Sequence, residues 1–311
     1  MRIEREPFGS RLTEASAVTI GKFDGVHLGH RAVLGHTVRR ARELGIDAVA
    51  VTFDRNPLAL LQPDASPPAL VRLDRRLELI EQTGIDLVAV LDFDAARAAQ
   101  SAQDFVDELL VARLGARLVL VGADFRFGAR GRGDVAMLRR MGEDRGFAVE
   151  LLAAVGGAGV ERISTSGIRE LIAAGRVREA AARLGSLPAV TGEVVLGNQR
   201  GRELGFPTAN LAEDSVGAMP ADGVYAGWLT VAGGERMPAA ISVSDNPTFS
   251  TGDRRRIEAF VLDRTIELYG QVATVEFVDR VRGIARFDSI ESLVERMAVD
   301  VAETRAILGL D

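Results

Sequence analysis

The first half of the chain alternates short apolar runs with amphipathic segments. Near-continuous apolar runs predict strands, and helical spacing closed by a glycine predicts helices. The predicted strands are Ala17–Ile20, Ala48–Phe53, Leu87–Leu91, Leu118–Val121 and Ala148–Leu152, and the predicted helices are Arg31–Leu44, Asp74–Thr83, Ala102–Leu114 and Val135–Arg145. Apolar strands separated by helices predict a parallel sheet covered on both faces, a Rossmann-like α/β domain. Ligands of such sheets bind beyond the carboxyl ends of the strands.

The pattern changes near Ser186, where shorter β-type runs with frequent Gly and Pro begin. These runs are Gly192–Leu196, Gly223–Thr230, Ala239–Val243, Ile257–Leu262 and Ala273–Phe277. They predict an antiparallel sheet or a small antiparallel β-barrel. A C-terminal helix follows, with Asp288 and Glu291 as a capping pair, and we expect its apolar stripe to pack on the barrel. The chain is therefore predicted to hold two domains, residues 1–184 and 188–311.

Composition narrows the class of protein. The 311 residues are 47% hydrophobic, enough for two cores, and the absence of cysteine excludes disulfides and thiolate metal sites. The charged segment Met1–Ser10 predicts no signal peptide, and no apolar run is long enough to predict a membrane span. A net charge of -6 argues against broad nucleic-acid binding. We expect a cytoplasmic protein with no membrane or nucleic-acid partner, and a homo-oligomer stays open.

All three histidines of the chain, His27, His30 and His36, lie within ten residues. Two of them end the run Gly21–His30, which leads from a predicted strand through a Gly-rich turn into a helix. Free amides and the helix dipole make such a helix start a phosphate site, and spacing i, i+3 puts His27 and His30 on one face. Gly29 between them is expected to admit a ligand close to the backbone. The alternative is an ordinary histidine pair at a helix start, and His36 is expected to be a partly buried helix residue.

Two loops of the first half stand out. The segment 62–70 holds three prolines and is expected to be a stiff surface excursion. The segment 126–133 is rich in Arg and Gly. It is either a solvated flexible loop or a mobile lid over phosphates, and the residues alone leave both open.

The H-x-G-H run resembles the signature of the nucleotidyltransferase superfamily, in which two imidazoles contact the phosphates of ATP. Further segments resemble the bacterial bifunctional riboflavin kinase/FAD synthetase (FMN adenylyltransferase) family, in family order and over nearly the whole chain. They are Gly21–His30, Thr52–Pro57, Val121–Gly128, Ile163–Arg169, Gly201–Leu211, Asp222–Tyr225, Asn246–Phe249 and Ile257–Phe260. The run G-R-E-L-G-F-P-T-A-N within the fifth segment is highly specific for that family.

For the first domain the resemblance implies transfer of AMP from ATP to FMN, which gives FAD and pyrophosphate. The implied catalytic residues are His27, His30 and Arg169; the implied ATP-binding residues are Gly21, Phe23, Asp24, Gly29, Ser164 and Ser166; the implied flavin-binding residues are Asn56, Asp124, Phe125 and Phe127. The two serines are alternatively plain helix caps, and the two phenylalanines are alternatively core residues. Asn56 stands where the family commonly has His.

For the second domain the resemblance implies phosphorylation of riboflavin by ATP, with Mg²⁺ or another divalent cation. Glu258 is the implied general base, Thr208 and Asn210 the implied metal ligands, and the implied ATP-binding residues are Gly197, Gly201 and Asn246. Alternation along the Glu258 run puts this side chain inside the barrel or leaves it a surface acid. Thr208 and Asn210 are expected to share one strand face.

Two departures from the family pattern affect the second domain. Leu196 and Asp245 stand where the family commonly has His and Thr. They leave two alternatives to a bifunctional enzyme. One is an FMN adenylyltransferase whose kinase domain is weak or inactive, and the other is a flavin-responsive regulatory binding protein.

Overall fold

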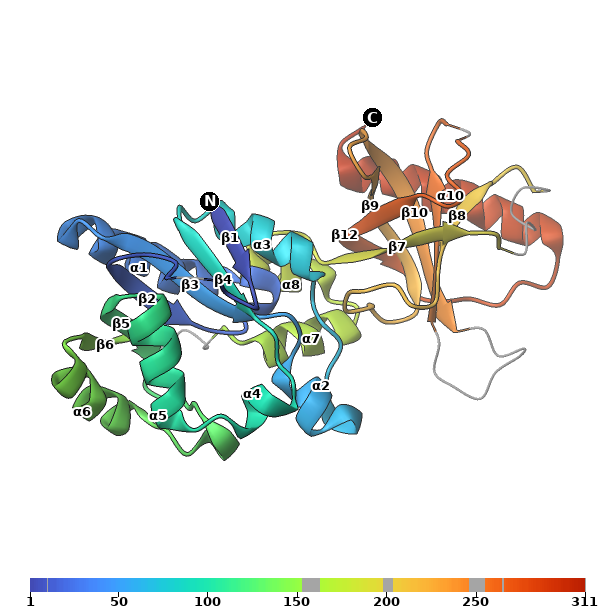
Figure 1. Cartoon of the computed structure of the whole chain (residues 1–311). Coiled ribbons are helices and arrows are strands. Elements are labelled where there is room, and N and C mark those ends of the chain that lie inside the picture. The colour runs from blue at the N-terminus through green and yellow to red at the C-terminus, as the bar shows by residue number, and fades with distance from the viewer. Residues whose placement is uncertain (10, 153–162, 198–203, 246–254, 265, 311) are drawn as a thin grey trace. The chain divides into compact units, whose positions relative to one another are not determined.

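The structure is a computed structural model that describes residues 1–9, 11–152, 163–197, 204–245, 255–264 and 266–310. The chain forms two compact units (Figure 1). The first holds Met1–Pro67 and Leu73–Ile163, and the second holds Pro68–Arg72 and Ser164–Asp311. This division differs from the predicted domains of 1–184 and 188–311, because it assigns the helices after Ser164 to the second unit. Among the described residues, no helix is both long and apolar enough to cross a membrane.

A parallel sheet of six strands is the centre of the first unit, in the order β1-β4-β3-β2-β5-β6. Its strands are β1 (Arg2–Arg5), β2 (Ser16–Ile20), β3 (Asp47–Phe53), β4 (Leu87–Leu91), β5 (Ala116–Gly122) and β6 (Ala148–Leu152). The five predicted strands are confirmed. The pattern missed β1 because its residues are charged and mostly exposed, as an edge strand allows. Strand order reverses at β2, where a ligand crevice is expected.

The helices of the first unit lie between its successive strands in the chain. They are α1 (Leu28–Leu44), α2 (Pro57–Leu61), α3 (Leu73–Glu81), α4 (Ala95–Ala99), α5 (Ala102–Asp104) and α6 (Val135–Arg145), with short 3₁₀ turns η1 (Asp24–Val26), η2 (Pro63–Ala65) and η4 (Ala129–Gly131). The predicted helix from Ala102 continues past α5 as a π-helix, η3 (Phe105–Arg113). Alternate strand residues face two separate cores. Val18, Val49 and Val51 lie in one and their alanine neighbours in the other.

The two loops noted in the sequence, segments 62–70 and 126–133, differ in exposure and in backbone hydrogen bonding. Segment 62–70 is mostly exposed and contains η2, as expected of a surface excursion, but Leu70 at its end is buried. Segment 126–133 is closed by a pair of backbone hydrogen bonds. Phe127 donates to Gly133 at 3.1 Å and Gly133 donates to Phe127 at 2.9 Å. A role of this segment as a lid stays a prediction.

The second unit contains a closed antiparallel barrel in the order β10-β11-β8-β7-β12-β9. Its strands are β7 (Ala189–Val195), β8 (Thr208–Leu211), β9 (Gly223–Val231), β10 (Arg236–Asp245), β11 (Arg255–Val261) and β12 (Val272–Arg282), and its helices are α7 (Thr165–Ala173), α8 (Val177–Leu184) and α10 (Ile290–Leu308). The predicted barrel and C-terminal helix are confirmed. The core holds alternate residues of the strands, among them Ile257 and Ala259 of β11.

The C-terminal helix corrects one detail of the prediction. Ser289 caps α10, because its side chain accepts a hydrogen bond from the Ser292 amide at 3.2 Å, so the predicted Asp288–Glu291 capping pair is wrong. The stripe Leu293, Val294, Met297 and Val301 is half-buried, while Ile290 is exposed. The deepest carboxylate of the helix, Asp300, forms an ion pair with Arg282 of β12 at 2.7 Å. Pairing offsets the cost of burying this charge and fastens α10 to the barrel.

Candidate active sites

The turn between β2 and α1 is built from strained backbone. Phe23 and Val26 have positive φ angles of 47° and 41°, and Gly25 has one of 75°. The Phe23 ring folds over Gly21, where a Cβ atom would lie 3.0 Å from ring carbons. A side chain at position 21 would therefore require the Phe23 ring to shift by a few tenths of an ångström. Such strain persists only where surrounding contacts hold it, and it gathers at functional sites.

His27 and His30 form one stacked unit at the start of α1. His27 is the helix N-cap, and its Nδ1 accepts a hydrogen bond from the His30 amide at 3.2 Å. The two rings stack with centroids 3.6 Å apart and planes 15° apart, which confirms that they share one face. A Cβ atom at Gly29 would lie 3.0 Å from His27 Cε1. Gly29 thus makes room for the imidazole, and close approach of a ligand to the backbone at this position stays a prediction.

Burial fixes the protonation of this pair. Burial lowers the pKa of His27 to about 4, and burial together with the neighbouring His27 lowers the pKa of His30 to about 3. Both imidazoles are therefore neutral near pH 7. Because Nδ1 of His27 accepts from the backbone, the ring proton of the neutral imidazole sits on Nε2. Nδ1 of His30 is buried and hydrogen-bonds to none of the described residues.

Two other predicted ATP residues lie in the same turn. The Phe23 side chain is buried and packs edge-on against His30, with ring centroids 5.4 Å apart. Any contact of Phe23 with ATP would therefore come from its backbone. Asp24 is half-buried in η1. His36 lies half-buried on α1 as expected, with its Nε2 2.6 Å from Glu150 Oε1.

The predicted flavin residues follow β3 and β5, the two neighbours of β2 in the sheet. Asn56 caps α2, because its Oδ1 accepts from the Leu58 amide at 3.2 Å. Asp124 is exposed. Phe125 is half-buried and stacks on Phe127, which is only 6% exposed and belongs to the core. The structure favours the core alternative for Phe127, whereas Phe125 keeps an exposed part for a ligand.

The predicted residues around Arg169 belong to the second unit. Ser164 caps α7 by accepting from the Gly167 amide at 3.1 Å, as the capping alternative expected, and α7 begins at Thr165. Ser166 is exposed. Arg169 Nε donates to the Pro68 carbonyl at 2.9 Å, which ties α7 to the segment 68–72. Contact of these residues with the ATP bound at the histidine pair stays a prediction.

Glu258, Thr208 and Asn210 meet on two neighbouring strands of the barrel. Glu258 lies opposite Asn210 in the register of β11 and β8. Thr208 Oγ1 donates to Glu258 Oε2 at 3.5 Å, and Asn210 Nδ2 donates to Thr208 Oγ1 at 3.3 Å. The shared face of Thr208 and Asn210 is confirmed. Glu258 alternates with the core residues Ile257 and Ala259, so it is half-buried on the outer face and its placement inside the barrel is wrong.

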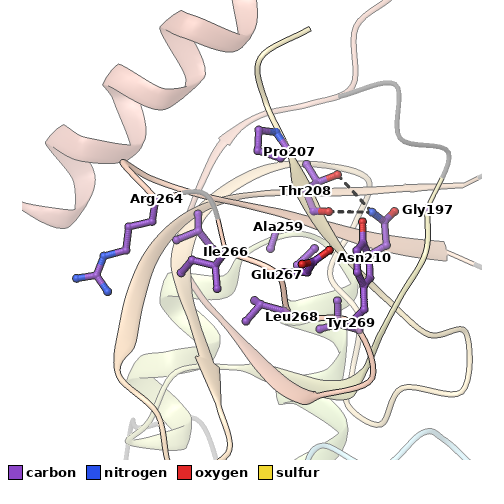
Figure 2. Close-up of a pocket in the computed structure, with 13 residues that line it drawn as sticks. Gly197, Pro207, Thr208, Asn210, Ala259, Arg264, Ile266, Glu267, Leu268 and Tyr269 are labelled. Atoms are coloured by element: carbon purple, nitrogen blue, oxygen red, sulfur yellow. Dashed lines mark hydrogen bonds between the residues drawn. The ribbon is translucent and has the colours of Figure 1, made fainter. Parts of the chain in front are cut away.

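A cavity of about 240 Å³ lies beside these strands, and Thr208 and Asn210 line it (Figure 2). Gly197 also lines it, and a Cβ atom at this position would fall 2.5 Å from the Asn210 carboxamide. Five further lining residues come from the loop after β11 and had no signal in the sequence beyond a mixed apolar and charged run: Arg264, Ile266, Glu267, Leu268 and Tyr269. The predicted ATP residues Gly201 and Asn246 lie outside the described residues.

Comparison with known proteins assigns a different family model to each half of the chain. A family model described as FAD synthetase matches residues 10–167, and one described as riboflavin kinase matches residues 184–308. The bifunctional riboflavin kinase/FMN adenylyltransferase of Escherichia coli K12 is 35% identical over 297 residues, covering 96% of this chain and 94% of that protein. The chain belongs to the bifunctional riboflavin kinase/FMN adenylyltransferase family. The relative from Pseudomonas fluorescens is 35% identical over 289 residues, covering 93% and 92% of the two chains.

Membership of the bifunctional riboflavin kinase/FMN adenylyltransferase family confirms the resemblance found in the sequence and makes ATP a co-substrate of both halves. The FAD synthetase model spans the histidine pair, and the riboflavin kinase model spans Thr208, Asn210 and Glu258. A solved structure described as a macrolide-efflux protein from Streptococcus pneumoniae is also similar, with a TM-score of 0.83 and 28% identity over 98% of this chain and 99% of that chain.

Proposed function

We propose that the chain phosphorylates riboflavin to FMN and then transfers AMP from ATP to FMN, with FAD and pyrophosphate as products. One observation carries this proposal: each of the two family models falls on its own cluster of side chains with matching chemistry. Helix-start amides and imidazoles lie under the first model. A carboxylate beside two oxygen donors lies under the second.

In the proposed adenylyl transfer, an oxygen of the FMN phosphate attacks the α-phosphorus of ATP. The bond from that phosphorus to the bridging oxygen breaks, and pyrophosphate leaves with the electron pair. The nucleophile is already anionic at neutral pH, so the site needs alignment and hydrogen-bond donors rather than a base. The amides at the start of α1 and the ring N–H groups of His27 and His30 supply such donors.

The remaining residues of the first site have proposed roles in holding its two substrates. Ser164, Ser166 and Arg169 would add hydroxyl and guanidinium contacts to ATP. Asn56, Asp124 and Phe125 would hold the flavin, because they follow the strands on either side of β2. Phe127 supports Phe125 from the core.

In the proposed kinase reaction, the terminal ribityl hydroxyl of riboflavin attacks the γ-phosphorus of ATP, and ADP leaves. This nucleophile is neutral, so a base that takes its proton is useful. Glu258 is that base. Its Oε2 accepts a hydrogen bond from Thr208 Oγ1 at 3.5 Å, which orients the carboxylate on the outer face of the barrel.

The kinase family implies a divalent cation, and the donor set beside Glu258 suits Mg²⁺. Thr208 and Asn210 offer a hydroxyl and an amide oxygen from one strand face. Among the described residues, no group of three His, Asp or Glu side chains could hold a metal. Two protein oxygens leave room for the waters and phosphate oxygens that Mg²⁺ retains. When bound there, the ion would neutralise charge on the ATP phosphates.

A chromatographic time course on the purified protein tests this proposal. With riboflavin, ATP and Mg²⁺ we expect FMN to appear first and FAD to follow, and with FMN as substrate we expect FAD directly. FAD from FMN with no turnover of riboflavin would support the alternative of an inactive kinase domain, which the departures from the family pattern at Leu196 and Asp245 motivate. Tight flavin binding without any product would support the regulatory binding protein instead.

A further inference from the structure

Helix α3 carries a buried arginine that neither predicted site includes. Arg76 is only 7% exposed and lies on the apolar face of the helix with Leu77 and Ile80, which are also buried. Burying a guanidinium costs free energy unless its N–H groups find acceptors. The contacts of Arg76 therefore explain why a charged side chain occupies a core position.

The Arg76 guanidinium binds the turns that follow β2 and β3. Its Nη1 donates to the Lys22 carbonyl at 2.9 Å and to Thr52 Oγ1 at 3.3 Å, and its Nη2 donates to the Asp54 carbonyl at 3.4 Å. Thr52 Oγ1 also donates to the Lys22 carbonyl, at 3.2 Å. Among the described residues, no carboxylate is hydrogen-bonded to Arg76. Asp24 and Asp54 favour its charge only through space.

The Lys22 carbonyl, which accepts a hydrogen bond from Arg76, lies at the entry to the strained turn. The Lys22 carbonyl belongs to the peptide bond with Phe23, whose φ angle of 47° lies in the left-handed region, and Val26 follows with 41°. A left-handed φ angle is strained for a residue with a side chain, so the turn relaxes unless its neighbours hold it. Two hydrogen bonds to one carbonyl fix the direction of the chain just before α1 begins.

We propose that Arg76 is a positioning residue of the adenylyl-transfer site. It holds the turn 22–26 so that the amides at the start of α1 and the stacked imidazoles of His27 and His30 face the phosphates of ATP. Arg76 acts through this turn and through its permanent charge at the carboxyl edge of the sheet. The inference rests on the proposed FMN adenylyltransferase activity and adds a residue to that site.

The test compares Arg76 with its exposed neighbour Arg75, which pairs with Glu78 on the surface at 2.7 Å. Arg76→Lys keeps the charge but loses the fork of donors, and Arg76→Gln also loses the charge. We expect kcat for FAD formation from FMN to fall about 10-fold in the first and on the order of 100-fold in the second, since small displacements at a reacting centre have effects of this size. The KM for ATP should change much less than kcat.

Riboflavin phosphorylation, measured on the same samples, is the internal control for folding and concentration, and Arg75→Lys and Arg75→Gln are the matched controls. All four variants should keep that activity. FAD formation within two-fold of the original rate in both Arg76 variants would overturn the inference, as would an equal fall of both activities. If Arg76→Gln does not fold, Arg76→Lys decides. If the unaltered protein makes no FAD from FMN, the proposed function fails and the positioning role fails with it.

Discussion

The two candidate sites of this chain carry opposite kinds of hydrogen-bonding groups. The adenylyl-transfer site presents hydrogen-bond donors, namely helix amides and two imidazoles that burial keeps neutral. The kinase site presents acceptors, namely the Glu258 carboxylate with the oxygens of Thr208 and Asn210. The difference follows from the nucleophiles. An anionic phosphate needs donors around the phosphate that it attacks, whereas a neutral hydroxyl needs a base.

The two sites also differ in how the chain assembles them. The histidine pair comes from one continuous segment, a strand, a tight turn and a helix start. Glu258 and Thr208 lie 50 residues apart and meet only because β11 and β8 pair in one register. Each half can therefore be disabled separately, and each activity serves as the control for the other.

The largest effect is expected from Glu258→Gln. The amide keeps the size of the side chain but cannot take a proton, so FMN formation should fall by on the order of 10³-fold. FAD formation from FMN should stay unchanged. Initial rates of both reactions on one preparation measure this, and Glu193→Gln on the exposed face of β7 is the matched control. Loss of both activities in a folded variant would contradict the separation of the two sites.

An effect of intermediate size is expected from His30→Ala, on FAD formation instead of FMN formation. Removing one donor of a preorganised site should lower kcat for FAD formation by on the order of 10²-fold and leave riboflavin phosphorylation intact. His36→Ala is the control, because His36 lies on the same helix but pairs with Glu150. Equal FAD formation by the His30 and His36 variants would remove His30 from the site.

The sequence predicted the fold where local signals were strong. Apolar runs and glycine caps located the parallel strands and most of the long helices, and Gly45 and Gly146 do end α1 and α6 with positive φ angles. Strand β1 was missed because its exposed, charged residues resemble a loop and its pairing with β4 depends on residues 87–90 far along the chain. Edge strands carry little apolar pattern of their own.

The residues of the candidate sites were likewise predictable only where the local sequence decides their placement. The i, i+3 spacing sufficed to place His27 and His30 together, because one helix turn decides it. The face of Glu258 was not decided by alternation alone, since that requires knowing which of β11's two faces packs inward. The role of Arg76 was hidden too, because its acceptors Lys22 and Asp54 are brought to it only by the parallel sheet.

The smallest effect is a difference in acid sensitivity between the two units. The folded pKa values of His27 and His30, about 4 and about 3, lie below the ordinary value of 6.5. Between pH 6.5 and these lowered pKa values, the histidines bind more protons in the unfolded chain than in the folded one. The free energy of unfolding therefore decreases as the pH falls through this range. From pH 7 to pH 5 one such imidazole lowers the stability of the first unit by about 2 kcal/mol. The raised pKa of Glu6, due to its burial, opposes this in part.

The barrel contains no histidine, so it should lose far less stability over this range and provides the reference. Native-state hydrogen exchange resolved by peptide gives the opening free energy of α1 and of the barrel strands separately, and the fluorescence of the single tryptophan, Trp228 on β9, reports barrel unfolding independently. A double variant, His27→Gln with His30→Gln, should remove the loss of α1 stability between pH 7 and pH 5. If α1 in the unaltered protein and the barrel weaken in parallel from pH 7 to pH 5, burial does not lower the pKa values of these imidazoles, and their assignment as donors that burial keeps neutral is overturned.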